Sequence, residues 1–334
     1  MTTYNKYSLA LNLSAKAQMD SVDPDTAKKS VQTVAHSGLN LQRRRLLNIF
    51  AAGISGASAW PVAAQSGTQK TVTSATNPRS GVALVLGSGG CRGHAHIGLI
   101  RVLEASDLRP DMVVGTSAGS LVGALYAAGL GASELERYGG QMDSEMMRDW
   151  KIPHLGMFGG NRISQFVNAR VGRRSIESLR TRYAAVTTDL RSGELVTLDR
   201  GDLATAVQAS SSAPGLVEPV VIGHRLCVDG SLVAPVPVMV ARSLGARFII
   251  ACDVSFPPRE AILEDPFDAL YQGFSILTRR LALEQRAEAD LVIAPRIPEH
   301  NDMKPATVTA LIAAGEAAAR QSLPAIRRLL KRAG

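Results

Sequence analysis

The chain has 334 residues, 46% hydrophobic and 20% charged, which excludes collagen-like, disordered and disulfide-framework proteins. Its net charge is +8, but residues 1–64 hold seven Lys and Arg against three Asp, so the remainder is only mildly basic. With 4% aromatic residues and three cysteines that lack metal-ligand spacing (Cys91, Cys227, Cys252), the sequence favours neither a nucleic-acid partner nor a metal.

The first 64 residues have the three-part pattern of an export leader. Three arginines at 43–45 precede an apolar stretch from Ile49 to Trp60, and Val62-Ala63-Ala64 supplies small residues for cleavage. Paired arginines before such a stretch are typical of a twin-arginine signal, so we expect cleavage near residue 64 and export to the periplasm. A disordered cytosolic tail and a leader retained as an inner-membrane anchor are the alternatives.

After a polar linker at 65–80, residues 81–334 are expected to form one α/β domain. Residues 82–86 are continuously apolar, as in a strand buried on both faces. A helix over 94–105, a second short strand over 112–114 and a helix over 120–128 follow. This alternation predicts the start of a mainly parallel sheet.

The rest of the chain continues in the same style. Residues 131–180 are expected to be mainly helical, and their Met and aromatic side chains form either core or a lid over the site. Asp202 is placed to cap a helix that ends near Ser211. Further strands are predicted at 184–188 and 194–198 (a hairpin), 218–222, 225–228, 248–252 and 291–293, and further helices at 267–285 and 306–331.

A Gly-x-Ser-x-Gly pattern carries the strongest chemical signal. Gly115-Thr116-Ser117-Ala118-Gly119 lies directly between a predicted strand and a predicted helix. A serine on such a sharp turn needs small neighbours, here Gly115 and Gly119, and the turn projects its hydroxyl into open space. We therefore expect Ser117 to be a nucleophile rather than a helix-capping serine.

The loop after the first strand is rich in glycine. Its residues are Gly87, Ser88, Gly89, Gly90, Cys91, Arg92 and Gly93. Converging backbone amides in such a loop bind either a cofactor phosphate or the oxyanion of an acyl-transfer intermediate. A dinucleotide fingerprint needs glycine at position 92 and an acidic residue after the second strand, and both are missing. We expect an oxyanion hole and no cofactor.

The base that activates Ser117 is less clearly marked. None of the histidines at 94, 96, 154, 224 and 300 stands in a context typical of a base. Asp229 ends an apolar strand and precedes Gly230, a position that suits either a turn or a catalytic carboxylate.

Four ordered blocks resemble the patatin-like phospholipases over about residues 81–295. They are the glycine loop, the serine turn, Ala209-Ser210-Ser211-Ser212-Ala213-Pro214, and Asp229-Gly230 followed by Leu232-Val233-Ala234-Pro235-Val236-Pro237. The resemblance implies a three-layer α/β/α fold and hydrolysis of lipid acyl esters by a Ser/Asp dyad. Carried over by position, Ser117 is the nucleophile and Asp229 its partner, while Ser88 to Gly93 form the oxyanion loop.

Two departures and two rival functions accompany this resemblance. Ser88 and Ser231 replace residues that are usually glycine or alanine, and Ser231 can hydrogen-bond Asp229 and lower its basicity. A Ser/His/Asp hydrolase would use Ser117, Asp229 and His300 in that order. A lipid-binding module without turnover is the second rival. The expected partners are a lipid substrate and a membrane surface.

Overall fold

The computed structural model of the chain describes residues 81–141, 149, 154–256, 263–264, 266–297 and 304–331. The predicted leader, the linker, His300 and four residues of the predicted lid region (Met142, Met146, Met147 and Trp150) lie outside the described residues.

An eight-stranded sheet forms the centre of the domain. Its strand order is β10-β9-β1-β2-β4-β8-β7, and β5 pairs with β4 off this path. The five strands from β10 to β4 are parallel, whereas β5, β7 and β8 join by antiparallel pairs. The strands are β1 (Val82–Leu86), β2 (Met112–Thr116), β4 (Arg182–Asp189), β5 (Leu195–Leu198), β7 (Val220–Ile222), β8 (Arg225–Asp229), β9 (Phe248–Cys252) and β10 (Leu291–Ile293).

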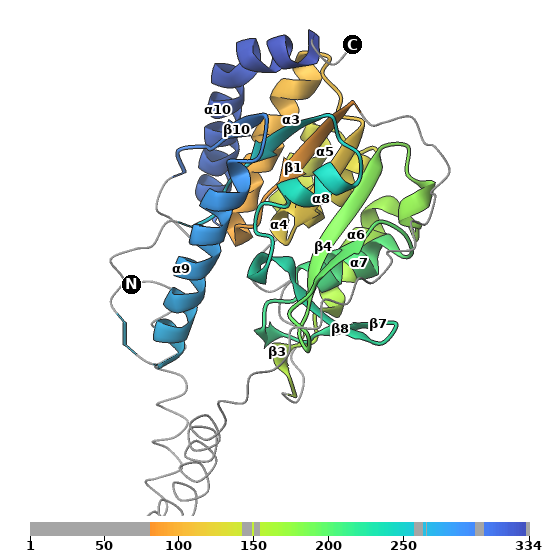
Figure 1. Ribbon diagram of the computed structural model, residues 1–334, viewed down its shortest axis with the longest axis vertical. Helices are drawn as coiled ribbons and strands as arrows, with labels where there is room; N and C mark the ends of the chain where they lie inside the picture. The colour runs from red at the N-terminus through yellow and green to blue at the C-terminus, as the bar shows by residue number, and fades with distance from the viewer. Residues whose placement is uncertain are drawn as a thin grey trace, which may run out of the picture. The chain divides into compact units, whose positions relative to one another are not determined.

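Helices cover both faces of this sheet, so the domain has three layers (Figure 1). The helices are α3 (Ala95–Ala105), α4 (Ala118–Ala127), α5 (Ala132–Gly139), α6 (Asn161–Val171), α7 (Leu203–Ser210), α8 (Val238–Ser243), α9 (Pro266–Arg286) and α10 (Pro305–Lys331). Three short 3₁₀ helices are η1 (Gly90–His94), η2 (Ile176–Ser178) and η3 (Gly230–Leu232).

Alternate side chains of β1 point into two separate cores. Leu84 and Leu86 pack with α3, α4, α7 and α10, whereas Ala83 and Val85 pack with α8 and with Ala282 of α9. A strand buried on both faces needs an unbroken apolar run, which explains why residues 82–86 contain no polar residue.

The expected α/β fold with a mainly parallel sheet is confirmed, with some corrections. Over 131–180 the described residues are mainly helical as expected, in α5, α6 and η2, but the strand β3 (Gly156–Phe158) was not expected; it pairs with β6 (Gly215–Val217) in a separate two-stranded parallel sheet. The first predicted helix starts at Ala95, after the 3₁₀ turn η1, and the second starts directly after Ser117. Among the described residues, no helix has the length and apolar content that crossing a membrane requires.

Parallel pairing brings the functional loops to one edge of the sheet. β1, β2 and β9 run in the same direction, so the glycine loop, Ser117 and the segment from Asp253 onward all follow carboxyl-terminal strand ends. Ligands of open α/β sheets bind at this edge.

Candidate active site

Ser117 occupies a strained turn between β2 and α4. Its φ of 55° and ψ of −121° lie in a region that a non-glycine residue adopts only under constraint. The constraint comes from close packing: a Cβ on Gly119 would lie 2.1 Å from the Leu86 carbonyl oxygen, and one on Gly115 would lie 2.4 Å from the Gly119 oxygen. Only glycine fits at both positions. Ser117 remains half-buried, so its side chain is not sealed in the core.

A buried serine supports this turn from behind. The Ser117 amide donates to Ser210 Oγ at 3.0 Å, and the Ser210 hydroxyl donates to the Val186 carbonyl at 2.7 Å. Ser210 ends α7 and is fully buried. The Ser117 backbone is therefore tied to the strand β4 beside it.

Asp229 is held just as firmly, at the end of β8. Its amide donates to the Ser212 carbonyl at 2.8 Å, and its carbonyl accepts from Thr188 Oγ1 at 3.0 Å. Its carboxylate Oδ1 accepts from the Ser231 amide at 2.8 Å. A Cβ on Gly230 would lie 2.2 Å from the Val186 oxygen, so the chain must have glycine directly after Asp229.

The fold brings the side chains of Ser117 and Asp229 close enough together to interact. Burial raises the pKa of Asp229 above its usual value, whereas the neighbouring Ser117 hydroxyl and the amide and hydroxyl of Ser231 act in the opposite direction. The expected contact between Ser231 and Asp229 is therefore present, but burial is the larger effect. A carboxylate with a raised pKa is a stronger base toward a serine hydroxyl.

Two amides of the glycine loop already donate to backbone carbonyls of the protein. Ser88 donates its amide to the Pro235 carbonyl at 2.8 Å, and Arg92 donates its amide to the Gly89 carbonyl at 3.0 Å. Of the six residues that the sequence assigned to the oxyanion loop, Ser88 and Arg92 thus support it instead of pointing amides at a ligand. Gly90 has a φ of 53°, which glycine adopts without strain.

The loop also contacts the serine turn directly. A Cβ on Gly93 would lie 2.6 Å from the Ala118 Cβ, so η1 packs against the residue that follows Ser117. Gly89 is equally close to its neighbour, because a Cβ there would lie 2.6 Å from the Val254 carbonyl oxygen. These contacts fix the loop amides relative to Ser117.

Arg92 turns its side chain away toward the segment after β9. Its Nε donates to the Val254 carbonyl at 2.8 Å, and its guanidinium lies 5.3 Å from the centre of the Phe256 ring. The Arg92 side chain is buried. Arg92 therefore joins the glycine loop to residues 253–256.

The two histidines nearest in sequence to the loop bond to backbone carbonyls. His96 Nε2 lies 2.9 Å from the Gly87 oxygen, and burial lowers the pKa of His96 to about 4, so the ring is neutral and donates. His94 Nδ1 lies 2.7 Å from the Cys91 oxygen. Both rings hold the loop in place, as expected for structural histidines.

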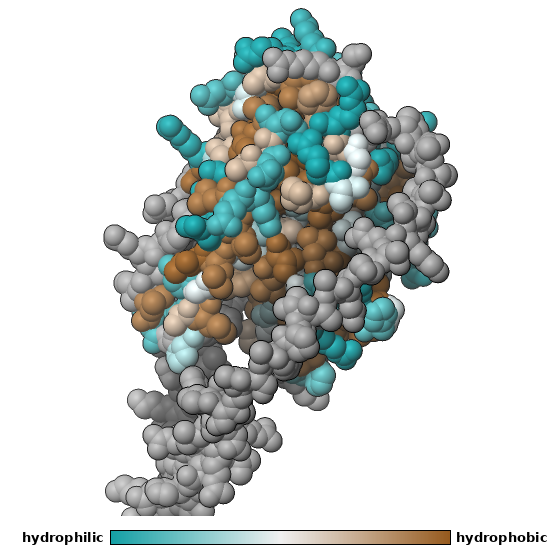
Figure 2. Space-filling model, in the orientation of Figure 1, coloured by the Kyte–Doolittle hydropathy of each residue, from teal (hydrophilic) through white to brown (hydrophobic). Residues whose placement is uncertain are grey.

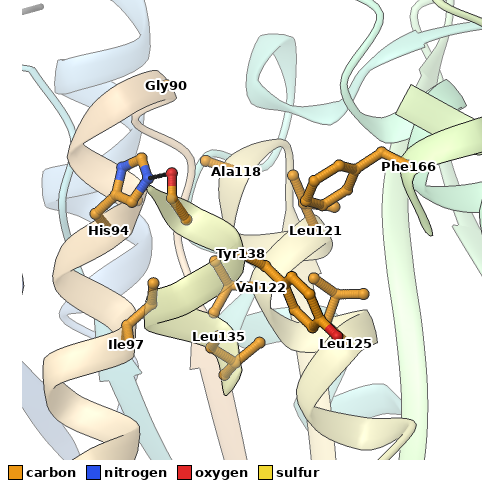
Figure 3. Close-up of a pocket in the computed structure, with 12 residues that line it drawn as sticks. Gly90, His94, Ile97, Ala118, Leu121, Val122, Leu125, Leu135, Tyr138 and Phe166 are labelled. Carbon is orange, nitrogen blue, oxygen red and sulfur yellow. Dashed lines mark hydrogen bonds between the residues drawn. The ribbon is translucent and has the colours of Figure 1, made fainter. Parts of the chain in front are cut away.

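A small apolar cavity of about 30 Å³ opens beside Ala118, the residue that follows Ser117. Figure 3 shows Gly90 and Ala118 at one end and Leu125 and Tyr138 at the other. Its walls come from α3, α4, α5 and α6, and its lining residues include Ile97, Leu121, Val122, Leu135 and Phe166. An aliphatic chain is the ligand that such walls favour.

Sequence reasoning missed the residues that position the site. Asp253 has a fully buried side chain that accepts from Arg279 Nη1 at 3.1 Å and Arg286 Nη1 at 2.7 Å. It also accepts from the Ser255 hydroxyl, which in turn receives a hydrogen bond from Arg279. The position of Asp253 directly after a buried strand was the one available signal, and the sequence does not show its partners on α9.

Comparisons with known proteins agree with this geometry. The sequence model of the family described as patatin-like phospholipase matches residues 84–242. This range contains the glycine loop, Ser117 and Asp229.

This chain matches only part of the length of its relatives. An uncharacterised NTE family protein of Mycobacterium bovis is 35% identical over 55% of this chain and 51% of its own length. The human patatin-like phospholipase domain-containing protein 6 is 34% identical over 60% of this chain and 15% of its own length. This chain therefore matches from about a seventh to about half of these relatives.

A solved structure supports the fold. The crystal structure of VipD from Legionella pneumophila superposes with a TM-score of 0.50 at 13% identity, covering 75% of this chain and 68% of that one. At this identity the similarity concerns the architecture alone.

Proposed function

This chain belongs to the patatin-like phospholipase family, and on that premise we propose that it is a serine acyl hydrolase that cleaves carboxylic esters of lipids, phospholipids or lysophospholipids. The observation that carries the proposal is the close approach of the half-buried Ser117 side chain to the buried Asp229 carboxyl beside a glycine loop. No histidine is required in this arrangement.

The proposed reaction has two halves. Ser117 Oγ attacks the ester carbonyl carbon while Asp229 accepts the hydroxyl proton, and the loop amides hold the oxyanion. Collapse breaks the ester bond, and the leaving alcohol takes the proton from Asp229. Water then attacks the acyl-serine, gives a proton to Asp229, and releases the fatty acid as the proton returns to Ser117.

The glycine loop supplies the oxyanion donors in this proposal. The amides of Gly89 and Gly90 are the favoured candidates, because the Ser88 amide already donates to the Pro235 carbonyl and the Arg92 amide to the Gly89 carbonyl. Each such donor contributes typically about 3 kcal/mol in the transition state. Gly93 serves the packing against Ala118.

The apolar cavity is proposed to take the first carbons of the acyl chain. It begins at Gly90 and at Ala118, the residue that follows Ser117, and most of its lining residues are aliphatic or aromatic. A lipid acyl group fits these walls better than a polar substrate does.

Labelling of Ser117 by a fluorophosphonate probe, together with turnover of p-nitrophenyl butyrate, tests the proposal. The Ser117→Ala variant should lose both signals. Ser243→Ala, which removes a hydroxyl that bonds the Val240 carbonyl on α8, should keep both. A folded wild-type protein that neither labels nor turns over would instead be a lipid-binding module.

A substitution of His300 distinguishes the rival Ser/His/Asp mechanism from the proposed one. His300 lies outside the described part of the chain. His300→Ala should retain turnover within about twofold if Asp229 is the base. A loss of several hundredfold or more would transfer that role to His300.

We further propose that residues 1–64 export the protein and that residues 81–334 form the hydrolase domain. The arginines at 43–45 and the following apolar stretch support the first part. Replacing Arg43, Arg44 and Arg45 by lysine should retain the protein in the cytoplasm in a cell fractionation experiment, whereas export of this variant would contradict the twin-arginine assignment.

A further inference from the structure

Helix α9 presents its polar side to the domain. Among the described side chains of α9, Ser275 and Ala282 are the buried ones, and Arg279 and Arg286 reach inward to the carboxylate of Asp253. At about 100° per residue, these four α9 residues lie within roughly 60° of the helix circumference. The face that docks on the sheet is thus made of small and charged residues.

Large apolar side chains are exposed along the amino-terminal half of the same helix. Leu270 is 73% exposed, Leu277 66%, Tyr271 52% and Ile276 47%. A helix on the surface of a globular domain normally has the opposite arrangement, with apolar residues inward and charged residues outward. Large exposed apolar patches of this kind mark interaction surfaces.

The apolar half of α9 lies at the edge of the sheet that holds the active site. α9 connects β9 to the parallel strand β10, so it begins at the carboxyl-terminal strand ends and runs back to the opposite edge. The thirteen residues before Arg279 form about 20 Å of helix. Figure 1 shows this half extending away from the sheet, and brown atoms gather over it in Figure 2.

Charge is distributed unevenly along the helix and the turn that follows it. Residues 266–278 contain one charged residue, Asp268, whereas residues 279–290 contain six. The charged half is fastened to the domain through Asp253, and Gln285 adds a hydrogen bond to the Val233 carbonyl at 2.7 Å. The carboxyl-terminal half of α9 is therefore suited to contact water and the domain, and the amino-terminal half to contact an apolar phase.

From these observations, and resting on the proposed function, we propose that the amino-terminal half of α9 inserts into a lipid surface and holds the active site against it. The exposed apolar side chains from Leu270 to Leu277 spread over roughly 220° of the helix circumference. Pairing with a second helix uses a narrower stripe of roughly 100°, so immersion in lipid fits the wide distribution better than a second copy of the chain does.

α9 is linked to the glycine loop through residues 253 and 254. Asp253, which holds Arg279 and Arg286, is followed by Val254, whose carbonyl accepts from Arg92 and abuts Gly89. A lipid surface that holds α9 therefore faces the same edge as Ser117. An ester bond in that surface would need to move only a short way to reach the nucleophile.

Tryptophan quenching in the full-length protein tests the insertion. The fluorescence that Leu277→Trp adds to that of the wild-type protein should decrease when vesicles of brominated phosphatidylcholine are added. The bromine quenches only tryptophans that enter the apolar phase. Met239→Trp is the matched control, since Met239 is 59% exposed on α8, and its added fluorescence should be unaffected. Equal quenching of the two variants, or an absence of quenching in Leu277→Trp, would overturn the proposal.

A double variant gives the second measurement. Leu270→Gln with Leu277→Gln keeps helix propensity and should reduce co-sedimentation with phosphatidylcholine vesicles at least tenfold, while Met239→Gln leaves it unchanged. Unchanged sedimentation of the double variant would overturn the proposal and assign vesicle binding to the leader. A wild-type dimer that becomes monomeric in the double variant would overturn it in favour of a second copy of the chain on α9. Vesicle binding without ester turnover would contradict the proposed function instead.

Discussion

Ser117 and Asp229 are 112 positions apart in the sequence, yet their side chains lie close enough to interact. Two tight backbone approaches make this possible: Gly119 against the end of β1, and Gly230 against β4. Ser210 and Ser212 complete the arrangement, because one binds the amide of Ser117 and the other accepts from the amide of Asp229. Ser117 and Asp229 are thus held by the Ser210 hydroxyl at the end of α7 and by the backbone carbonyl of Ser212 just after it.

The pH dependence of turnover should follow Asp229. Only the ionised carboxylate can accept the Ser117 proton, and burial raises the pKa of Asp229. We expect kcat/KM to fall as the pH falls through a pKa above the ordinary aspartate value. Asp229→Asn should reduce kcat by about 10³-fold at every pH. An acid limb at the ordinary aspartate pKa, or full activity in Asp229→Asn, would contradict this role.

The same residue should reduce the stability of the wild-type protein at neutral pH. Because the pKa is higher in the folded chain than in the unfolded one, the folded chain binds the proton more tightly, and the free energy of unfolding decreases as the pH rises from the unfolded to the folded pKa. Asp229→Asn removes the buried charge. Its Tm should therefore exceed that of the wild type at pH 7, with the difference shrinking in acid; an equal or lower Tm at pH 7 would contradict the linkage.

The turn at Ser117 should tolerate no side chain at Gly119. A methyl group there would lie 2.1 Å from the Leu86 carbonyl oxygen, and neither backbone can move without disrupting β1 or α4. We expect Gly119→Ala to lower the free energy of unfolding by about 3 kcal/mol or more and to abolish turnover. Thermal denaturation and fluorophosphonate labelling measure the two effects.

Gly273→Ala is the matched control for this prediction. Gly273 lies within α9 and has open space where a Cβ would be added. Alanine there should raise helix stability by about 0.5–1 kcal/mol with turnover unchanged. Equal Tm values for the two variants would show that the contact at Gly119 does not constrain the turn.

Much of the sheet could be predicted from the sequence because its strands are short, continuous apolar runs that end at glycine or aspartate. β1 and β9 have the predicted bounds, and Asp202 caps α7 through the amide of Thr205 as expected. The strand β3 was missed because it has three residues, and its partner β6 lies more than fifty positions away. No local pattern encodes so short a pairing.

The site was predictable where a backbone constraint leaves a glycine in the sequence. Gly115, Gly119 and Gly230 each mark a close approach of two backbone segments. Gly115 and Gly119 lie two residues before and after Ser117, and Gly230 directly follows Asp229. The ion pairs of Asp253 were not predictable, since Arg279 and Arg286 belong to a helix whose position depends on tertiary packing. The hydrogen bonds of two loop amides were not predictable either. The Ser88 amide donates to Pro235 in a distant segment, and the Arg92 amide donates to Gly89 in the turn of the loop itself.

Asp253 should act as a positioning residue for the oxyanion loop. Asp253→Asn weakens two ion pairs to a buried carboxylate and shifts Val254, which supports Gly89 and Arg92. We expect a loss of about 3 kcal/mol in stability and a fall in kcat with little change in KM, because the loop acts on the transition state. Urea denaturation and steady-state kinetics measure both.

A surface ion pair on the same helix provides the control. Glu284 pairs with Arg280 at 2.8 Å, with both side chains largely exposed. Glu284→Gln should change stability by less than about 1 kcal/mol and leave kcat unchanged. If Asp253→Asn reduces stability but not kcat, the cluster is structural and does not position the loop.

The apolar cavity should set the preferred acyl length. Leu125 lies at the far end of the cavity from Gly90 and Ala118, and Leu125→Ala removes three carbon atoms there (Figure 3). At about 0.8 kcal/mol for each buried methylene, Leu125→Ala should favour a p-nitrophenyl ester that is three carbons longer than the butyrate. The ratio of kcat/KM for the longer ester to kcat/KM for the butyrate should rise by at least about tenfold.

Leu103→Ala is the matched control, since Leu103 is equally buried in the core but does not line the cavity. Both variants should lose about 3 kcal/mol of stability, and only Leu125→Ala should change the ratio. The same ratio in both variants would mean that the acyl chain lies elsewhere on the site edge, and that the cavity is a packing defect between α3, α4 and α5.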